Sequence, residues 1–204
     1  MGYFISFEGP EGSGKSTVIK EVYDYLTQEG YDVIMTREPG GIRIAEEIRN
    51  LILNPDHQEM DDRTEALLYA ASRRQHVVEK IQPALKANKI VLCDRFIDSS
   101  LAYQGYGRDI GIDEVYQINT FAIENCMPNL TLFFDVHPEI GMERIGQRGF
   151  KDRLEQAGDT FHERVYEAYH QLWQENPQRI QRIDAEVSLE EVIASSIKKI
   201  KEYI

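Results

Sequence analysis

Near the N-terminus, a short glycine-rich segment combines the residue types that bind phosphate. Gly9-Pro10-Glu11-Gly12-Ser13-Gly14-Lys15-Ser16 fits the pattern G-x-x-x-x-G-K-[ST], and Thr17 follows it. Its glycines allow backbone angles that other residues avoid, so that successive N–H groups can face one anion at a helix start. Lys15 supplies a charge for the β- and γ-phosphates, and the Ser16 hydroxyl can complete a Mg²⁺ shell. The motif predicts that ATP or GTP binds to residues 9–17.

Two carboxylates near this motif have different predicted roles. Asp94 ends the apolar run Ile90-Val91-Leu92-Cys93, and a carboxylate at a strand end can hold Mg²⁺ directly or through water. Glu11 lies inside the phosphate motif, where it would repel phosphates that it faced. We therefore expect Glu11 to point away and to accept a hydrogen bond from a hydroxyl of a second substrate. The loop brings no arginine, so positive charge for the reaction must come from elsewhere in the chain.

Apolar runs of strand length alternate with segments of helical periodicity along the chain. The runs predict strands at residues 3–8, 32–37, 89–94, 130–136 and 180–184. The periodic segments predict helices at 16–28, 44–53, 63–87 (interrupted by Pro83), 113–125, 138–147, 162–174 and 189–203. Strands without strict polar alternation, separated by helices, predict a parallel sheet covered on both faces. We expect an α/β fold with a three-layer α/β/α architecture, a five-stranded parallel sheet and one domain over residues 1–204.

Composition narrows the class of protein. The chain has 35 acidic and 23 basic residues and a net charge of −12, which argues against non-specific binding to nucleic acid. It has no run of 18 apolar residues that would span a membrane and no visible secretory signal. Two cysteines, Cys93 and Cys126, are too few for a disulfide framework, so a cytoplasmic location is expected.

Proteins with a phosphate motif include switches, motors and kinases. A GTPase switch needs Asn-Lys-x-Asp, whereas the Asn-Lys here continues as Asn88-Lys89-Ile90-Val91. A motor or transporter ATPase is usually larger. A small kinase needs arginines that hold an anionic acceptor, and this chain offers candidates, namely Arg37, Arg49, Arg73, Arg74, Arg95, Arg144, Arg148 and Arg153.

Four blocks of the sequence together resemble the bacterial type of thymidylate kinase. They are Phe7-Glu8-Gly9-Pro10-Glu11-Gly12-Ser13-Gly14-Lys15-Ser16, Thr36-Arg37-Glu38-Pro39-Gly40-Gly41, Asp94-Arg95-Phe96-Ile97-Asp98-Ser99-Ser100-Leu101-Ala102-Tyr103-Gln104 and Asp152-Arg153-Leu154-Glu155. Their order and spacing cover most of the chain. The resemblance implies a phosphate-loop nucleoside monophosphate kinase that transfers phosphate from ATP to thymidine monophosphate, with Mg²⁺ held by Ser16 and Asp94.

The resemblance also implies a site for the acceptor nucleotide. Arg95 and Arg49 would hold its phosphate, since a planar guanidinium suits contact with two oxygens. Tyr69 would stack on thymine, and Arg73, one helical turn further on, would donate to a thymine carbonyl. The remaining side chains would read the base edge (Ser100, Gln104), pack on the deoxyribose (Tyr103), meet the 3′-hydroxyl (Glu11) and complete the site (Glu38).

By the same analogy, residues 146–156 would form a lid over ATP. Its arginines, Arg148 and Arg153, would supply the charge that the phosphate loop lacks, with Lys15 and Arg95 as the other catalytic residues. The family implies a homodimer. The sequence departs from the usual pattern of the family at two places. Ile42-Arg43-Ile44-Ala45 replaces a loop with proline and a later glycine, so that Arg43 could contact phosphate. Phe96 replaces a tyrosine that is commoner in the family.

Two alternatives remain open from the sequence. One is another small phosphate-loop kinase, acting on cytidine or uridine monophosphate or on a deoxynucleoside. The other is a non-catalytic nucleotide-binding switch, which would bind nucleotide without acceptor-dependent turnover.

Overall fold

Five strands form one parallel sheet in the computed structural model, which describes residues 2–146 and 152–204. The strands are β1 (Tyr3–Glu8), β2 (Val33–Arg37), β3 (Ile90–Asp94), β4 (Leu130–Asp135) and β5 (Ile180–Asp184). All neighbouring strands are parallel, and their order is β2-β3-β1-β4-β5. The connections after β1 and β4 run toward opposite edges of the sheet. Ligands of such folds bind beyond the carboxyl ends of the strands, where the segments that follow β1, β2 and β3 lie together.

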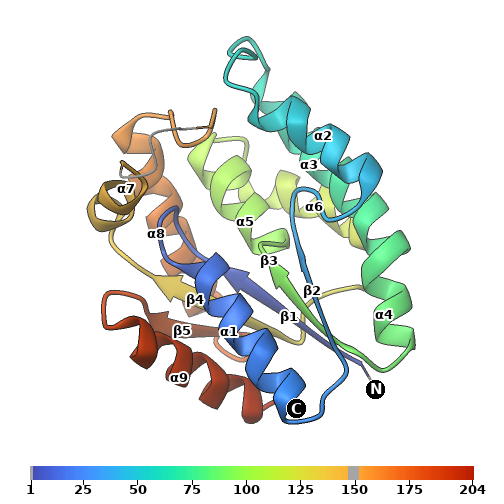
Figure 1. The fold of residues 1–204 in the computed structure, drawn as a ribbon. Helices are drawn as coiled ribbons and strands as arrows, with labels where there is room; N and C mark the ends of the chain where they lie inside the picture. Colours follow the sequence, from blue (N-terminus) through green and yellow to red (C-terminus); the bar gives the residue numbers. More distant parts are fainter. Residues whose placement is uncertain (1, 147–151) are drawn as a thin grey trace.

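Helices cover both faces of the sheet (Figure 1). In the described part of the chain they are α1 (Lys15–Gln28), α2 (Arg43–Leu53), α3 (Asp62–His76), η1 (Val77–Ile81), α4 (Gln82–Lys86), α5 (Ile97–Ser100), η2 (Leu101–Gly107), α6 (Ile112–Ile123), α7 (Pro138–Gly146), α8 (Asp159–Glu175) and α9 (Leu189–Lys201). No helix among these residues has the length and apolar character needed to cross a membrane.

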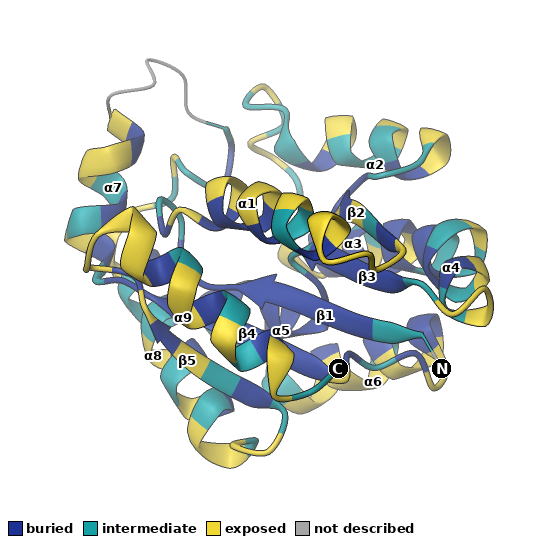
Figure 2. Cartoon of the chain, turned by 60° about the horizontal axis from the view of Figure 1, so that its bottom comes forward, coloured by how far each residue is buried: buried dark blue, intermediate teal, exposed yellow. Residues whose placement is uncertain are grey.

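Alternate residues of the strands point into two separate cores. Ile5 and Phe7 of β1 pack with apolar side chains of α1 and α9 on one face. Phe4 of β1 and Phe133 of β4 pack on the other face, where α3, η2, α6 and α8 contribute the helical side chains. Figure 2 shows the central strands β1, β3 and β4 buried between these two layers, whereas the edge strands β2 and β5 are partly exposed. The expected three-layer α/β/α architecture is therefore confirmed.

The predicted helix at 63–87 forms, but its middle is a π-helical turn. The chain continues without a break from α3 through η1 to α4. Pro83, near the start of α4, has no N–H to donate to the preceding turn. The N–H of Gln82 instead donates to the oxygen of Val77, five residues earlier, which is the hydrogen bond of a π-helix. Pro83 therefore widens the helix locally rather than ending it.

The sequence pattern gave no helix between residues 97 and 107, whereas the structure has α5 and η2 there. Gly105 and Gly107 lower the helical propensity of this segment, which explains the omission. Packing against α6 and α8 compensates, and the buried residues of η2 include Leu101, Ala102 and Tyr103. This helix matters for the site, because it carries Ser99, Ser100, Tyr103 and Gln104.

Candidate active site

The phosphate loop, residues 9–16, joins the end of β1 to the first turn of α1. Gly12 and Gly14 have φ angles of 71° and 82°, in the left-handed region that favours glycine. At Gly12 a Cβ atom would lie 2.1 Å from the carbonyl oxygen of Gly141 in α7, so no other residue fits there. Gly14 is the N-cap of α1. The N-terminus of α1 therefore faces the loop, in the geometry that favours an anion.

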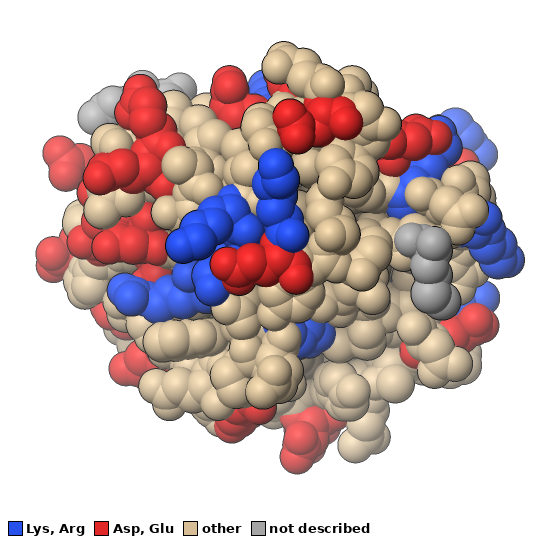
Figure 3. Space-filling view, turned by 90° about the horizontal axis from the view of Figure 1, so that it is seen from below, with Lys and Arg blue, Asp and Glu red and all other residues tan. Residues whose placement is uncertain are grey.

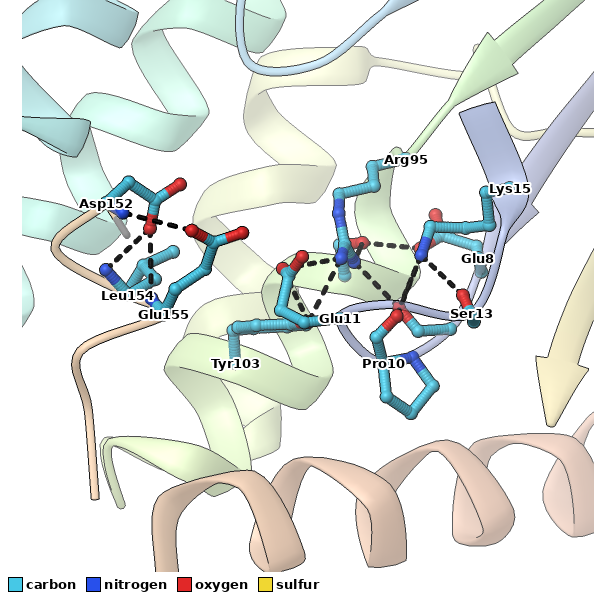
Figure 4. A network of polar contacts seen from close by, with 12 residues as sticks. Glu8, Pro10, Glu11, Ser13, Lys15, Arg95, Tyr103, Asp152, Leu154 and Glu155 are labelled. Atoms are coloured by element: carbon cyan, nitrogen blue, oxygen red, sulfur yellow. Dashed lines mark hydrogen bonds and ion pairs between the residues drawn. The ribbon is translucent and has the colours of Figure 1, made fainter. Parts of the chain in front are cut away.

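Lys15 lies at the centre of this loop and is buried. Its Nζ donates to the oxygens of Gly9 at 3.0 Å and Pro10 at 2.9 Å, and to Oγ of Ser13 at 2.8 Å (Figure 4). Burial and the nearby Arg95 lower the pKa of Lys15 to about 8. An approaching phosphate would offset both effects, because an opposite charge favours the protonated amine.

Asp94 meets the phosphate loop from the neighbouring strand. The register of β1 and β3 sets Asp94 opposite Phe7, just before the loop begins. Oγ of Ser16 donates to Oδ2 of Asp94 at 2.7 Å. A hydroxyl and a carboxylate are oxygen ligands of the kind that Mg²⁺ prefers, and they leave room for water and phosphate oxygens. Among residues 2–146 and 152–204 no cluster of three or more acidic, His or Cys side chains could hold a metal by itself.

Arg95 follows β3 and spans the space between the phosphate loop and η2. Its φ of 69° is unusual for a residue with a side chain. One guanidinium nitrogen donates to the oxygen of Gly9 at 2.9 Å, to Ser99 at 3.1 Å and to Tyr169 at 3.3 Å. The other donates to Oε1 of Glu11 at 2.6 Å. These contacts orient the guanidinium group before any ligand arrives.

Glu11 turns toward Arg95, as Figure 4 shows. The Tyr103 hydroxyl also donates to Oε1 of Glu11, at 3.0 Å. Burial alone would raise the pKa of Glu11, but the charges of Arg95 and Lys15 outweigh it and lower this pKa. The expectation that Glu11 points away from the phosphate cradle rested on repulsion. In the structure an attraction also orients Glu11, because its carboxylate forms an ion pair with Arg95.

Arg73 and Glu38 form a buried ion pair on the far side of this space. Nε of Arg73 donates to Oε2 of Glu38 at 2.7 Å. Its Nη1 donates to Oγ of Ser100 at 2.9 Å and to Oδ1 of Asn119, and its Nη2 donates to the oxygen of Phe96 at 2.9 Å. Together these bonds use four of the five N–H groups of the guanidinium. Arg73 is thus fixed in position, and one Nη2 N–H has no acceptor among the residues that the structure describes.

Fifteen of the residues predicted to bind the acceptor, the donor or Mg²⁺ line one cavity of about 270 Å³. Its walls bring the phosphate loop together with side chains from β2, α2, α3 and η2. Besides residues 11–17 and Asp94, the lining includes Arg37, Glu38, Pro39, Arg49, Leu53, Tyr69, Arg73, Arg95, Ser99, Tyr103, Gln104, Asp152, Leu154 and Glu155.

Comparison with known proteins identifies the family. A model of the family "Thymidylate kinase" matches residues 7–196. The chain belongs to the thymidylate kinase family. It is 55% identical over 205 residues to a thymidylate kinase of Oceanobacillus iheyensis, covering 100% of this chain and 91% of the relative. A thymidylate kinase of Finegoldia magna is 57% identical over 198 residues, covering 97% of each chain. A crystal structure of thymidylate kinase from Ehrlichia chaffeensis superposes with a TM-score of 0.80 at 35% identity, covering 98% of each chain.

Membership of the thymidylate kinase family confirms the resemblance of the four sequence blocks and the α/β fold that it implied. It also confirms that the chain is an enzyme, a phosphotransferase. Neither a kinase for another acceptor nor a non-catalytic switch is therefore favoured.

Among the described residues, four that were predicted for a thymidylate kinase site are not part of the cavity lining, namely Gly9, Pro10, Ser100 and Arg153. Ser100 accepts its hydrogen bond from Arg73 behind the wall. Arg153 is 7% exposed and donates to Glu65 and to the oxygen of Ile52, at 2.8 Å for the latter. Arg148, with residues 147–151 of the predicted lid, lies outside the described residues. Arg43, in the segment that departs from the family pattern, begins α2 and pairs with the exposed Glu47 at 3.0 Å.

Sequence reasoning missed several buried side chains that support the thymidylate kinase cavity. Glu8, at the end of β1, accepts from Ser99 at 2.5 Å, from the N–H of Phe96 at 2.6 Å and from Tyr169 at 3.2 Å. Burial and the nearby Asp98 raise the pKa of Glu8 to about 7. Its place directly before the phosphate loop was visible in the sequence, but Tyr169 lies in distant α8 and left no local signal.

Proposed function

We propose that the protein transfers the terminal phosphoryl group of ATP to thymidine monophosphate, forming thymidine diphosphate. The observation that carries this proposal is that the phosphate loop and the cluster of Arg73, Tyr69 and Gln104 line the same cavity. A triphosphate on the loop and a nucleoside monophosphate in that cluster would face one another directly. The names of the relatives support the choice of acceptor.

The acceptor nucleotide would occupy the half of the cavity between α2, α3 and η2. Arg95 and Arg49 would hold its phosphate, and Tyr69 would stack on the base. The remaining side chains would contact the base (Arg73, Gln104, with Ser100 behind Arg73) and the sugar (Glu11, Tyr103), with Glu38 fixing Arg73. Burial and the charge of Arg37 lower the pKa of the Arg49 guanidinium. A bound dianion would favour the charged guanidinium and raise this pKa again.

The donor would bind through residues 9–17. Its phosphates would take over the three ammonium donors that Lys15 now directs to Gly9, Pro10 and Ser13. Ser16 and Asp94 would hold Mg²⁺, which neutralises charge on the β- and γ-phosphates when bound.

The reaction needs alignment and charge rather than a strong base. The second pKa of a phosphate monoester is about 6, so the acceptor oxygen is already ionised at pH 7. Lys15, Arg95 and the lid arginines would stabilise the charge that spreads over the transferred group. Arg153 could take this role only after its side chain breaks its hydrogen bonds to Glu65 and to the oxygen of Ile52. The role of Arg148 is inferred from the sequence alone.

A homodimer and a cytoplasmic location belong to the same proposal. Phe121 on α6 is 87% exposed and Leu67 on the adjoining α3 is 57% exposed, which is unusual for large apolar side chains. A second copy of the chain would cover them. Both cysteines are free and buried, in keeping with a reducing compartment.

A panel of acceptors tests the proposed function. The purified protein is assayed with ATP, Mg²⁺ and each of thymidine, uridine and cytidine monophosphates in their deoxy forms, together with free thymidine. We expect the highest kcat/KM with thymidine monophosphate. A higher value with cytidine monophosphate or with a free nucleoside would contradict the proposal.

A further inference from the structure

A buried carboxylate outside the cavity lining contacts one of the residues that would read the base. Glu65 on α3 is fully buried. Its Oε1 accepts from Nε2 of Gln104 at 2.8 Å and from Nε of Arg108 at 3.4 Å. Its Oε2 accepts from Arg108 at 3.2 Å and from Arg153. Glu65 therefore joins three side chains, of which only Gln104 lines the cavity.

This contact decides which end of the Gln104 amide faces Glu65. A carboxylate offers only acceptors, whereas the amide of glutamine has a donor end and an acceptor end. The amide must therefore turn its NH₂ group toward Glu65. Among the described residues no donor is assigned to Oε1 of Gln104, although the side chain is almost completely buried. The acceptor end of the amide is thus left for a ligand in the cavity.

The edge of a pyrimidine base distinguishes these two amide ends. Thymine and uracil carry a hydrogen on N3 and can donate to a carbonyl oxygen. Cytosine has a lone pair on N3 and an amino group at position 4, so the donor and acceptor positions on its edge are exchanged. A buried site built around one pattern rejects the other, since a mismatch leaves polar groups unpaired.

We propose that Glu65 is a specificity-determining residue, which selects acceptors with an N3–H pyrimidine edge by fixing the amide orientation of Gln104. The proposal rests on the proposed acceptor site, in which Gln104 faces the base. Glu65 is a positioning residue, because it touches Gln104 and not the base.

The variant Glu65→Gln tests this orientation. Its carbonyl oxygen would take the place of Oε2, where Arg153 and Nη2 of Arg108 donate, because the contact of Arg108 on the Gln104 side is the longer one, at 3.4 Å. Its NH₂ group would then face Gln104, and the Gln104 amide would turn its own NH₂ group toward the cavity. The kcat/KM of deoxythymidine monophosphate relative to deoxycytidine monophosphate should fall by about 10- to 100-fold.

This ratio is insensitive to effects that both acceptors share, such as a smaller folded fraction or altered donor binding. Deoxyuridine monophosphate gives an internal control, because it shares the thymine edge, and its ratio to the thymidine nucleotide should stay constant. The matched variant Glu65→Asp keeps an acceptor-only group, so it should retain the wild-type preference even where kcat falls. An unchanged thymidine-to-cytidine ratio in Glu65→Gln would overturn the proposal.

Two further measurements separate the possible failures. In Gln104→Leu the kcat/KM of deoxythymidine monophosphate relative to deoxycytidine monophosphate should fall strongly. If it does so while Glu65→Gln leaves the ratio unchanged, the acceptor site stands and the role of Glu65 is rejected. If Gln104→Leu also leaves it unchanged, the proposed base site itself is wrong.

Should Glu65→Gln not fold, the wild-type enzyme still tests the amide orientation with N3-methylthymidine monophosphate. We expect its kcat/KM to be at least about tenfold below that of the parent nucleotide. Equal turnover would overturn the proposal.

Discussion

At the scale of single residues, the cavity is organised by charged groups that are buried before a ligand binds. Lys15 is shielded from solvent and faces Arg95, which lowers its pKa to about 8. Glu8, directly before the phosphate loop, has a pKa raised to about 7 by burial and by Asp98. Both groups therefore titrate near physiological pH. We expect Lys15 to link ATP binding to pH, and Glu8 to link the stability of the protein to pH.

Binding of ATP should take up a proton above pH 8. In the free protein Lys15 loses its proton around pH 8, whereas the bound phosphates favour the protonated amine and raise its pKa. Calorimetric titration with Mg²⁺-ATP at pH 9, in two buffers of different ionisation enthalpy, should report proton uptake that exceeds the value at pH 7. Uptake that is constant from pH 7 to pH 9 would contradict this prediction.

The stability of the protein should depend on Glu8 in a defined pH interval. The folded pKa of about 7 lies above the ordinary value of 4.5, so between these values the folded state binds more protons than the unfolded chain. The free energy of unfolding should therefore fall as pH rises from 4.5 to 7, by up to about 3 kcal/mol. Urea titrations of the wild type and Glu8→Gln should show this fall in the wild type only. Parallel pH profiles would refute it.

At the scale of elements, the site depends on close contacts between loops and helices. The phosphate loop touches α7 backbone to backbone at Gly12 and Gly141. The π-helical η2 brings Tyr103 and Gln104 to the cavity although its glycines disfavour a helix. The segment after the undescribed residues 147–151 is tied to α3 through Arg153 and Glu65. Two predictions follow from these contacts.

Gly12→Ala should impair ATP binding and stability together. The added Cβ would lie 2.1 Å from the Gly141 oxygen, at a φ of 71° that alanine adopts at a cost. We expect a loss of about 1–3 kcal/mol in the free energy of unfolding and at least tenfold weaker ATP binding, measured by denaturation and calorimetry. Gly158→Ala is the matched control, since its Cβ would meet nothing within 4 Å. Equal effects of the two variants would contradict the steric explanation.

Arg153→Ala should lower kcat by at least about tenfold and change the KM of thymidine monophosphate much less, if Arg153 stabilises the transferred group. Arg153→Lys keeps the charge and should recover part of the rate. Steady-state kinetics with both substrates measures the two effects. An unchanged kcat would mean that Arg153 only anchors its segment to Glu65 and Ile52.

At the scale of the whole molecule, the excess of acidic residues does not extend to the cavity, whose lining has five basic and five acidic side chains. The net charge is −12, while arginines and a lysine converge on the cavity. Figure 3 views the molecule from the side on which the two termini lie in Figure 1, and on this face acidic side chains are spread widely while basic ones gather in a group. Exposed apolar side chains, by contrast, occur on neighbouring helices α3 and α6.

The exposed Phe121 predicts how the molecule assembles. Sedimentation of the wild-type protein should give twice the chain mass of 23.6 kDa. Phe121→Glu would place a charge in the centre of an apolar contact and should shift the protein to the monomer. Glu21→Ala, on the exposed side of α1, serves as a surface control and should leave the mass unchanged. A dimer that persists in Phe121→Glu would exclude this surface.

The sequence by itself determined the sheet, the phosphate loop and the position of Asp94, because these depend on local patterns. Apolar runs define strands, and the glycine spacing with Lys15 and Ser16 defines an anion site without reference to distant residues. The resemblance of four blocks added the acceptor residues and the kinase activity.

Only the tertiary structure decided what those residues contact. Glu11 pairs with Arg95, Arg73 with Glu38, and Gln104 with Glu65, over separations of 84, 35 and 39 residues. No local pattern encodes such pairs, because their energies depend on burial and on which side chains the fold brings within hydrogen-bond distance. The helix at 97–107 belongs to the same class, since packing against α6 and α8 overrides the low helical propensity of its glycines.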